Sequence, residues 1–375
     1  MTDLGTHVLG PAWLAVVGDV VVMDTPAGVD PRLSGLLRAA ETAFANVESP
    51  LTTRGVPAEK AFVHRSDPAR AADLAALGID VATLANNHVL DFGAEGLDDT
   101  VAALDRAGIV TVGAGSDDTA ARAPAVRTTT SGRVALIGLC AALPPGFAAA
   151  PGHPGAAPLR VRQQVSIDPV LAAEQPGMAP FVHTSVVAAD LDAACAVVEA
   201  ARALADLVVV AVHWGVPHGF AAPSYGLLAQ YQRPAGHALI EAGAHLVVGH
   251  HPHELHPVER HRGGLIAYSV GNFLFHAWSD LAGDFMRVPA APYRSAFGSD
   301  VTLDSVLVLV SPPGDDGLTV RFVPATMVGG EPVLATGDRA QAIVDRLSDG
   351  AAGGPVVARA DLLPDTTIGE VLIEP

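Results

Sequence analysis

The stretch HLVVGHHPH, residues 245–253, places a short apolar strand directly before a turn that contains three histidines. An uninterrupted apolar run of this length is typical of a strand that is buried on both faces of a parallel sheet. Polar residues follow similar apolar runs at three other places: Asp19 after 13–17, Asn87 after 80–84 and His213 after 207–212. In α/β folds, ligands bind at the edge where such strands end. We therefore expect these four segments to meet at one functional edge.

Segments with helical spacing separate the apolar runs. The first covers residues 31–44, with Pro31 at a favourable first position. Buried strands that alternate with helices predict an α/β fold whose sheets are covered on their outer faces. Residues 141–182 are rich in Pro, Gly and Ala and have little periodicity, so we expect a long insert that acts as a lid or a binding loop.

The composition excludes some classes of partner. Half of the 375 residues are hydrophobic and the formal net charge is −18, so neither nucleic acid nor an anionic membrane is an expected partner. The N-terminus lacks the features of a signal peptide, and no apolar run reaches the roughly 18 residues of a membrane span. Cys140 and Cys195 have no CxxC spacing and are predicted to be free thiols. These features favour a cytoplasmic protein.

The motif His251-Pro252-His253 is a candidate pair of metal ligands. Histidines two positions apart in an extended segment point to the same side, and Pro252 stiffens the backbone between them. Taken alone, this motif is equally consistent with a histidine-rich surface turn. Taken alone, His213 is more typical of a buried core histidine than of a metal ligand.

The joint pattern favours a metal site. Two carboxylates, one amide oxygen and three imidazoles follow predicted strands: Asp19, Glu48, Asn87, His213, His251 and His253. This mixed set of nitrogen and oxygen ligands suits Fe(II), Mn, Co or Zn, and the absence of thiolates argues against a structural zinc site. Because a shared carboxylate is typical of two-metal hydrolases, we predict two divalent metal ions, with Fe or Mn preferred and Zn as an alternative.

The sequence resembles the CapA family in several motifs and in their order along the chain. These proteins are the poly-γ-glutamate capsule accessory proteins, which have a calcineurin-like metallophosphoesterase fold. The resemblance runs from about residue 13 to 276. It is carried by GDV (18–20), NVESPLT (46–52), NNHVLDFGAEGLDDT (86–100), HWG (213–215), ALIEAGAHLVVGHHPHELHPVE (238–259) and YSVGNFLF (268–275). It implies a four-layer αββα sandwich of the metallo-dependent phosphatase type over residues 1–312, with residues 313–375 as an extension packed on the same domain.

The resemblance also implies roles for individual residues. Asp19, Glu48 and His253 would hold one metal ion, and the second ion would be held by Glu48, Asn87, His213 and His251, so that Glu48 bridges the two. His88 would be the general acid, oriented by Asp91. His250 and Asn272 would support the site without holding metal.

The sequence departs from the family's pattern near the site. The wider superfamily has a histidine two residues after the first aspartate, where this chain has Val21. Met23-Asp24 stands where many members have a basic residue, and Pro217-His218 where many have Glu-Tyr. His218 could replace a missing group. The other histidines, including His64, are expected to be ordinary surface or core residues.

Three functions fit these observations. The first is metal-assisted hydrolysis of a phosphoester, amide or thioester in a small-molecule or polymer-linked substrate. The second is a non-haem di-iron oxygenase of specialised metabolism, with the insert 141–182 covering a hydrophobic substrate. The third is a non-catalytic accessory protein that binds a capsule polymer. The retention of all six candidate ligands favours an enzyme.

Overall fold

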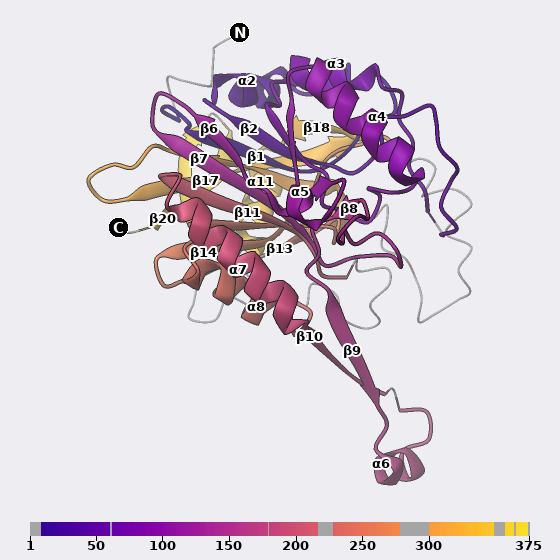
Figure 1. Cartoon of the computed structure of the whole chain (residues 1–375). Helices are drawn as coiled ribbons and strands as arrows, with labels where there is room; N and C mark the ends of the chain where they lie inside the picture. Colours follow the sequence, from indigo (N-terminus) through magenta and orange to yellow (C-terminus); the bar gives the residue numbers. More distant parts are fainter. Residues whose placement is uncertain are drawn as a thin grey trace.

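A computed structural model describes residues 9–60, 62–178, 180–216, 228–277, 300–348, 357–363 and 365–373. Two large β-sheets form its centre (Figure 1). Among these residues, no helix combines the length and the apolar character that crossing a membrane requires.

The larger sheet combines a parallel half and an antiparallel half. Its strands lie in the order β19 (Ala358–Leu363), β20 (Thr366–Ile373), β17 (Leu318–Val328), β16 (Asp304–Val310), β1 (Leu14–Val21), β2 (Ala43–Val47), β3 (Val81–Thr83) and β4 (Val110–Val112). The strands β1 to β4 are parallel neighbours. In addition, β15 (Asn272–Phe275) pairs with β1, and β18 (Glu331–Leu334) pairs with β17. Residues after 312 therefore supply strands of this sheet.

The smaller sheet has a parallel centre and antiparallel edges. Its order is β13 (Leu255–His261), β14 (Gly264–Val270), β12 (Leu246–His250), β11 (Leu207–His213), β7 (Arg133–Cys140) and β6 (Ala125–Thr128). All residues of β11 and β12 are buried, as their apolar sequences predict.

Hydrophobic cores lie on both faces of each sheet. The core between the sheets contains Val16 of β1 and Val209 of β11, and α11 (Gly337–Arg346) packs Ile343 into the same core. The outer face of the larger sheet packs on α2 (Pro31–Ala39), α3 (Arg70–Leu77) and α4 (Gly93–Arg106). The outer face of the smaller sheet packs on α7 (Ala188–Arg202) and α8 (Gln232–Glu241), on the opposite side in Figure 1. The predicted α/β class is confirmed.

The first predicted helix is too long. The helix α2 begins at Pro31, where the side chain of Asp30 accepts a hydrogen bond from the backbone N–H of Arg32, and it ends at Ala39. The prediction of a helix over 31–44 is wrong beyond that point, because residues from Ala43 form β2 between β1 and β3. Pairing with two neighbouring strands outweighs the local helical spacing.

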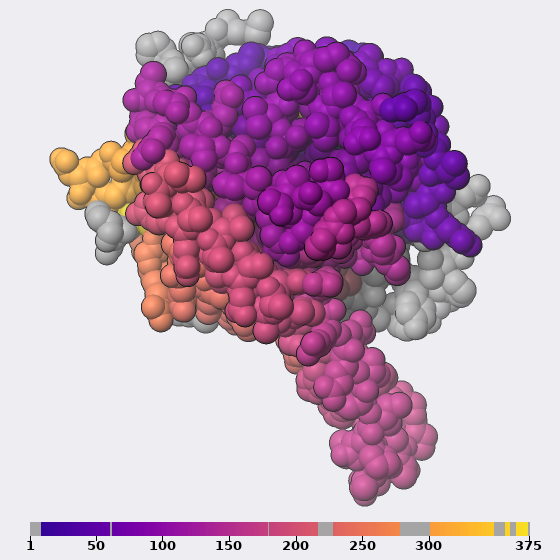
Figure 2. All heavy atoms as spheres, viewed as in Figure 1, coloured from indigo at the N-terminus to yellow at the C-terminus, as the bar shows by residue number. Residues whose placement is uncertain are grey.

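Residues within the predicted insert form an arm rather than a loop throughout. An antiparallel pair, β9 (Val161–Ser166) and β10 (Phe181–Val186), carries the short helix α6 (Pro169–Glu174) at its tip. Figures 1 and 2 show this arm projecting from the body of the molecule. Most of its side chains are exposed, including Ile167 and Phe181. Because neither face of the strand pair is buried, the sequence has no alternation of apolar and polar residues from which the strands could be predicted.

Candidate metal centre

The carboxyl ends of strands from both sheets bring the six predicted ligands together. Glu48 directly follows β2, Asn87 follows β3, and His213 is the last residue of β11. His251 and His253 lie in the turn after β12. Parallel strands end at one edge of a sheet, and the two sheets face each other, so residues distant in sequence meet there.

The sequence predicted that Asp19 follows the first strand, but in the structure Asp19 lies inside β1. The strand continues to Val21 because β15 pairs with it, with a change of register between Asp19 and Val20. The backbone N–H of Asp19 donates to the carbonyl of Gly271 at 3.1 Å. A Cβ atom on Gly18 would lie 1.9 Å from that same carbonyl oxygen, so only glycine allows this approach.

Glu48 is shared by two groups of potential ligands. One group is Asp19, Glu48 and His253, and the other is Glu48, His213 and His251; within each group the ligand atoms lie within 4.8 Å of one another. Both carboxylate oxygens of Glu48 are buried and have no hydrogen-bond partner among the described residues. A buried carboxylate without a partner is costly, and a bound cation would remove that cost.

The distances between ligand atoms fit metal coordination. Nitrogen and oxygen ligands lie about 2.1 Å from their ion and therefore about 3 Å from one another. His213 Nε2 lies 2.9 Å from Asn87 Oδ1 and 3.5 Å from Glu48 Oε1. His253 Nε2, the ring nitrogen that makes no contact with Asn272, lies 3.9 Å from Glu48 Oε1. The ring of His251 is 4.6 Å from that of His213, and its buried Nδ1 has no hydrogen-bond partner in the described part of the chain.

Burial and neighbouring charges divide the ligands into charged and neutral groups. Burial raises the pKa of Glu48 well above its usual value, and the charge of Asp19 adds to this effect. Burial also acts to raise the pKa of Asp19, but hydrogen bonds with His250 and His253 outweigh it and lower the pKa. Burial lowers the pKa of His213, so its imidazole is neutral and available as a ligand.

The two histidines of the turn differ from each other in charge. Burial lowers the pKa of His251 to about 3. For His253, burial acts in the same direction, but the carboxylates of Glu48 and Asp19 outweigh it and raise the pKa to about 9.

The histidine turn is strained and not extended. His251 has φ = 93° and His253 has φ = 56°, both in the left-handed region that non-glycine residues rarely adopt. The prediction that alternation in an extended segment aligns the two rings is therefore wrong. Instead, the backbone N–H of His251 donates to Asp19 Oδ2 at 3.1 Å, which ties the turn to β1. Each such residue costs about 1–3 kcal/mol, and such strain is concentrated at functional sites.

Amides and one further imidazole hold the ligands in place. Asn46 Nδ2 donates to Asp19 Oδ1 at 2.8 Å and lies 3.3 Å from His213 Nδ1. Asn86 in turn donates to Asn46 Oδ1 at 3.0 Å. His250 Nδ1 lies 3.1 Å from Asp19 Oδ1, and Asn272 Oδ1 lies 2.8 Å from His253 Nδ1. Such supporting contacts fix the tautomer and the orientation of metal ligands.

His88 and Asp91 lie beside the ligands as a hydrogen-bonded pair. His88 Nδ1 is 2.6 Å from Asp91 Oδ2, and its Nε2 is 4.0 Å from Glu48 Oε1. The second oxygen of Asp91 accepts from Lys60 Nζ at 2.7 Å, and Lys60 also donates to the backbone carbonyl of Asn87 at 2.6 Å. One edge of the His88 ring is therefore fixed and the other faces the ligands.

The sequence analysis missed Lys60 and His64. Lys60 is the only lysine in the chain, a signal that could have identified it. His64, expected to be an ordinary histidine, lies with its ring centroid 4.1 Å from that of His88, and burial lowers its pKa to about 2. Val21 fills the position of the missing ligand and packs against Phe275 in a small core. Pro217 and His218 lie outside the described residues.

Comparison with known proteins agrees with the resemblance found in the sequence. The family described as "Bacterial capsule synthesis protein PGA_cap" matches residues 14–277. A probable polyglutamine synthesis accessory protein of Mycobacterium tuberculosis is 35% identical over 297 residues, which cover 76% of this chain and 66% of that protein. The capsule biosynthesis protein CapA of Bacillus anthracis is 32% identical over 199 residues, covering 53% and 40% of the two chains.

Two further relatives broaden the comparison. An uncharacterized protein of Sinorhizobium fredii is 30% identical over 345 residues, covering 80% of this chain and 72% of its own length. The PGA biosynthesis protein CapA of Bacillus subtilis is 28% identical over 243 residues, covering 64% and 54%. The region matched by the family contains all six predicted ligands together with Lys60, His88 and Asp91. The chain therefore belongs to the CapA family of bacterial capsule synthesis proteins.

Proposed function

We propose that this protein is a dinuclear metal-dependent enzyme that hydrolyses a phosphoester, amide or thioester bond. The observation that carries the proposal is the Glu48 carboxylate, which is buried, has no hydrogen-bond partner among the described residues and belongs to both ligand groups. We also propose that the two facing sheets with their outer helices form the four-layer αββα sandwich of the metallo-dependent phosphatases. In that fold, the shared carboxylate would bridge the two ions.

The residues present fit two divalent ions, with Fe or Mn preferred over Zn because the ligands combine carboxylate, amide and imidazole groups. Asp19, Glu48 and His253 would hold one ion, and the other would be held by Glu48, Asn87, His213 and His251. When bound, the ions would supply a hydroxide nucleophile and stabilise negative charge that develops in the transition state.

The role proposed for His88 is to protonate the leaving group from Nε2. This atom faces the ligands, while Asp91 accepts at Nδ1 and fixes the ring. In that hydrogen bond, Nδ1 carries a proton and donates it to Asp91. Nε2 must therefore gain a second proton before it can give one to the leaving group. Lys60 donates to Asp91 and to the backbone next to His88, and so positions the pair. The substrate would be a small molecule or linked to a polymer.

The proposal is tested by metal content and activity together. Protein purified without oxygen is expected to contain about two Fe or Mn ions per chain by elemental analysis. It should then release product from a panel of phosphoester, amide and thioester substrates. His213→Ala should lose both metal and activity while keeping its circular dichroism spectrum. His237→Ala is the control, because His237 contacts Glu259 and neither residue belongs to a ligand group. Protein that binds no metal after reconstitution would refute the proposal.

Two alternatives give different results in the same experiment. About two iron ions with an absorption spectrum that changes on exposure to oxygen would identify the di-iron oxygenase. A non-catalytic accessory role is suggested by the relative named a polyglutamine synthesis accessory protein. It predicts binding of a capsule polymer that survives His213→Ala, with no turnover of any substrate.

A further inference from the structure

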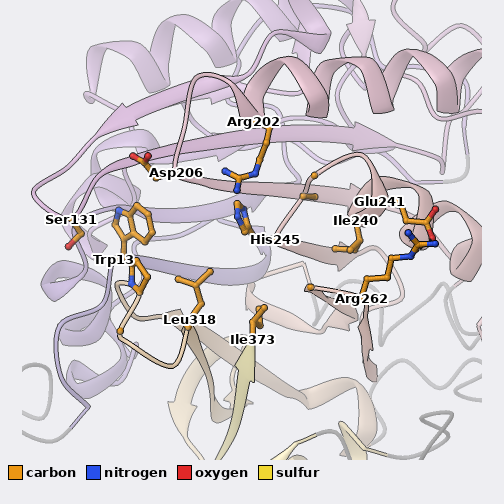
Figure 3. Close-up of a pocket in the computed structure, with 16 residues that line it drawn as sticks. Trp13, Ser131, Arg202, Asp206, Ile240, Glu241, His245, Arg262, Leu318 and Ile373 are labelled. Carbon is orange, nitrogen blue, oxygen red and sulfur yellow. Dashed lines mark ion pairs between the residues drawn. The ribbon is translucent and has the colours of Figure 1, made fainter. Parts of the chain in front are cut away.

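A cavity lies at the ends of the parallel strands that are opposite to the proposed metal ligands. Its volume is about 790 Å³, within the range of small-molecule sites. It is lined by residues that directly precede strands: Trp13 before β1, Asp206 before β11 and His245 before β12 (Figure 3). The metal ligands lie at or after the other ends of these strands. The cavity is therefore separate from the metal centre and does not contribute to its substrate site.

The carboxylates of this cavity already have partners. Glu241 Oε1 lies 3.1 Å from Arg262 Nε and 2.8 Å from His261 Nε2. Asp206 Oδ2 accepts a hydrogen bond from the backbone N–H of Arg133 at 2.8 Å. These contacts offset the negative charges of the lining and occupy Arg262.

Arg202 is different, because it makes no ion pair with any carboxylate that the structure describes. Arg202 is the last residue of α7, so its charge also favours the C-terminal end of that helix. Among the described residues, the guanidinium of Arg202 makes one hydrogen bond. It runs from Nη1 to the carbonyl of Ala205 and is long at 3.4 Å. Most of its five donors are therefore available to a ligand.

His245 adds a second donor beside Arg202. The backbone N–H of Val208 donates to His245 Nδ1 at 2.9 Å, so Nδ1 is the unprotonated nitrogen of a neutral ring. Burial lowers the pKa of this histidine to about 4, and the charge of Arg202 acts in the same direction. The remaining proton is on Nε2, which is therefore a donor. Figure 3 shows the guanidinium of Arg202 next to this ring, on the wall of the cavity.

Apolar side chains form another part of the wall. Trp13 lies on one side of His245, and Leu318 and Ile373 lie across the cavity from Arg202 (Figure 3). A ligand with an apolar body could contact these side chains while its anionic group reaches the two donors. Hydrogen bonds from a guanidinium to a carboxylate are stronger than those between neutral groups.

We propose that this cavity binds an aliphatic carboxylate, whose carboxylate group accepts hydrogen bonds from Arg202 and His245 Nε2 and whose chain lies against Trp13, Leu318 and Ile373. The site is independent of the metal centre, so a ligand bound here would occupy the molecule together with a substrate at the other end.

Isothermal titration calorimetry on the full chain tests this proposal with probes of equal length. Octanoate is expected to bind, whereas octanol and octylammonium should bind at least tenfold more weakly because they cannot accept from both donors. Butyrate should bind more weakly than octanoate, because it buries less apolar surface. Removal of metal should not change any of these affinities.

Variants then locate the site. Arg202→Gln and His245→Asn should each weaken octanoate binding at least tenfold, while the metal content stays unchanged. The Asn side chain can still accept from Val208, which guards against misfolding. Arg106→Gln is the matched control, because Arg106 lies in the last turn of α4 and is also exposed. Equal binding of octanol and octanoate, preference for octylammonium, or full binding by Arg202→Gln would each overturn the proposal.

Discussion

The two ends of the parallel strands of both sheets use polar residues in opposite ways. At the carboxyl ends, Glu48 is buried without a hydrogen-bond partner in the described part of the chain, and His251 and His253 have strained backbones. At the amino ends, Asp206 is exposed and bonded to backbone. Buried, unpaired and strained groups cost folding free energy, and they are retained where a ligand needs them. Mutations of the buried polar groups at the first end should therefore reduce metal binding without lowering stability.

The largest expected effect comes from Glu48→Gln. Loss of the shared carboxylate should reduce the metal content from about two ions to near zero, because both ligand groups contain Glu48. The metal-free variant should unfold at a denaturant concentration no lower than that of metal-free wild type, since the buried carboxyl group that it replaces has no hydrogen-bond partner among the described residues. Glu259→Gln is the control, because Glu259 is buried and already bonded to Arg233 and Tyr268. Full metal content in Glu48→Gln would show that Glu48 does not bridge the ions.

Alanine substitutions of one glycine at each end test how tightly the backbone is packed there. Gly18→Ala should lower the free energy of unfolding by about 3 kcal/mol or more, because its Cβ would collide with the carbonyl of Gly271. At the cavity end, a Cβ on Gly314 would meet no atom closer than 4.0 Å. Gly314→Ala should therefore change stability by less than about 1 kcal/mol, which urea denaturation of both variants would measure. Similar losses in both would refute the difference in packing.

Asn46→Ala tests the groups that hold the ligands. Asn46 contacts both Asp19 and His213, so its loss should weaken metal binding about 10- to 100-fold in a competition assay with a chelator. At the other end, Thr129 accepts a hydrogen bond from Trp13 Nε1 at 2.9 Å. Thr129→Ala should leave the metal affinity unchanged. An equal effect of the two variants would point to general destabilisation.

Lys60→Met is expected to have the smallest effect of the four. It removes the hydrogen bond to Asp91 but no proposed metal ligand, so the metal content should be retained. The turnover number with any substrate identified above should fall about tenfold with little change in KM, because the orientation of His88 is lost. Lys60→Arg should restore part of the activity. A change in KM alone would assign Lys60 to substrate binding.

The sequence identified most of the residues that meet at the proposed metal centre, because polar residues that follow apolar segments stand out. An amide or a carboxylate directly after a buried strand is visible without a structure. The path of the backbone was not visible: Asp19 lies within β1 because β15, more than 250 residues later, extends the pairing. The strain at His251 likewise depends on a contact with Asp19 of the other sheet. Local patterns do not contain such long-range contacts.

The arm and the cavity were not predictable for a related reason. The strands β9 and β10 expose both faces, so their sequences have no apolar alternation. Arg202 and His245 are separated by more than 40 residues, and each has an ordinary local role at the end of a helix or before a strand. Only the packing of α7 on the smaller sheet brings them to one wall.

The single lysine gives the molecule a built-in reporter of local opening. A lysine-specific protease has one cleavage site in the whole chain, immediately after Lys60. The side chain is only 16% exposed, and its amine is held by Asp91 and Asn87. Cleavage therefore requires the edge that carries the proposed metal site to open. Its rate would measure how often that edge opens, and ligands that close the edge should slow the cut.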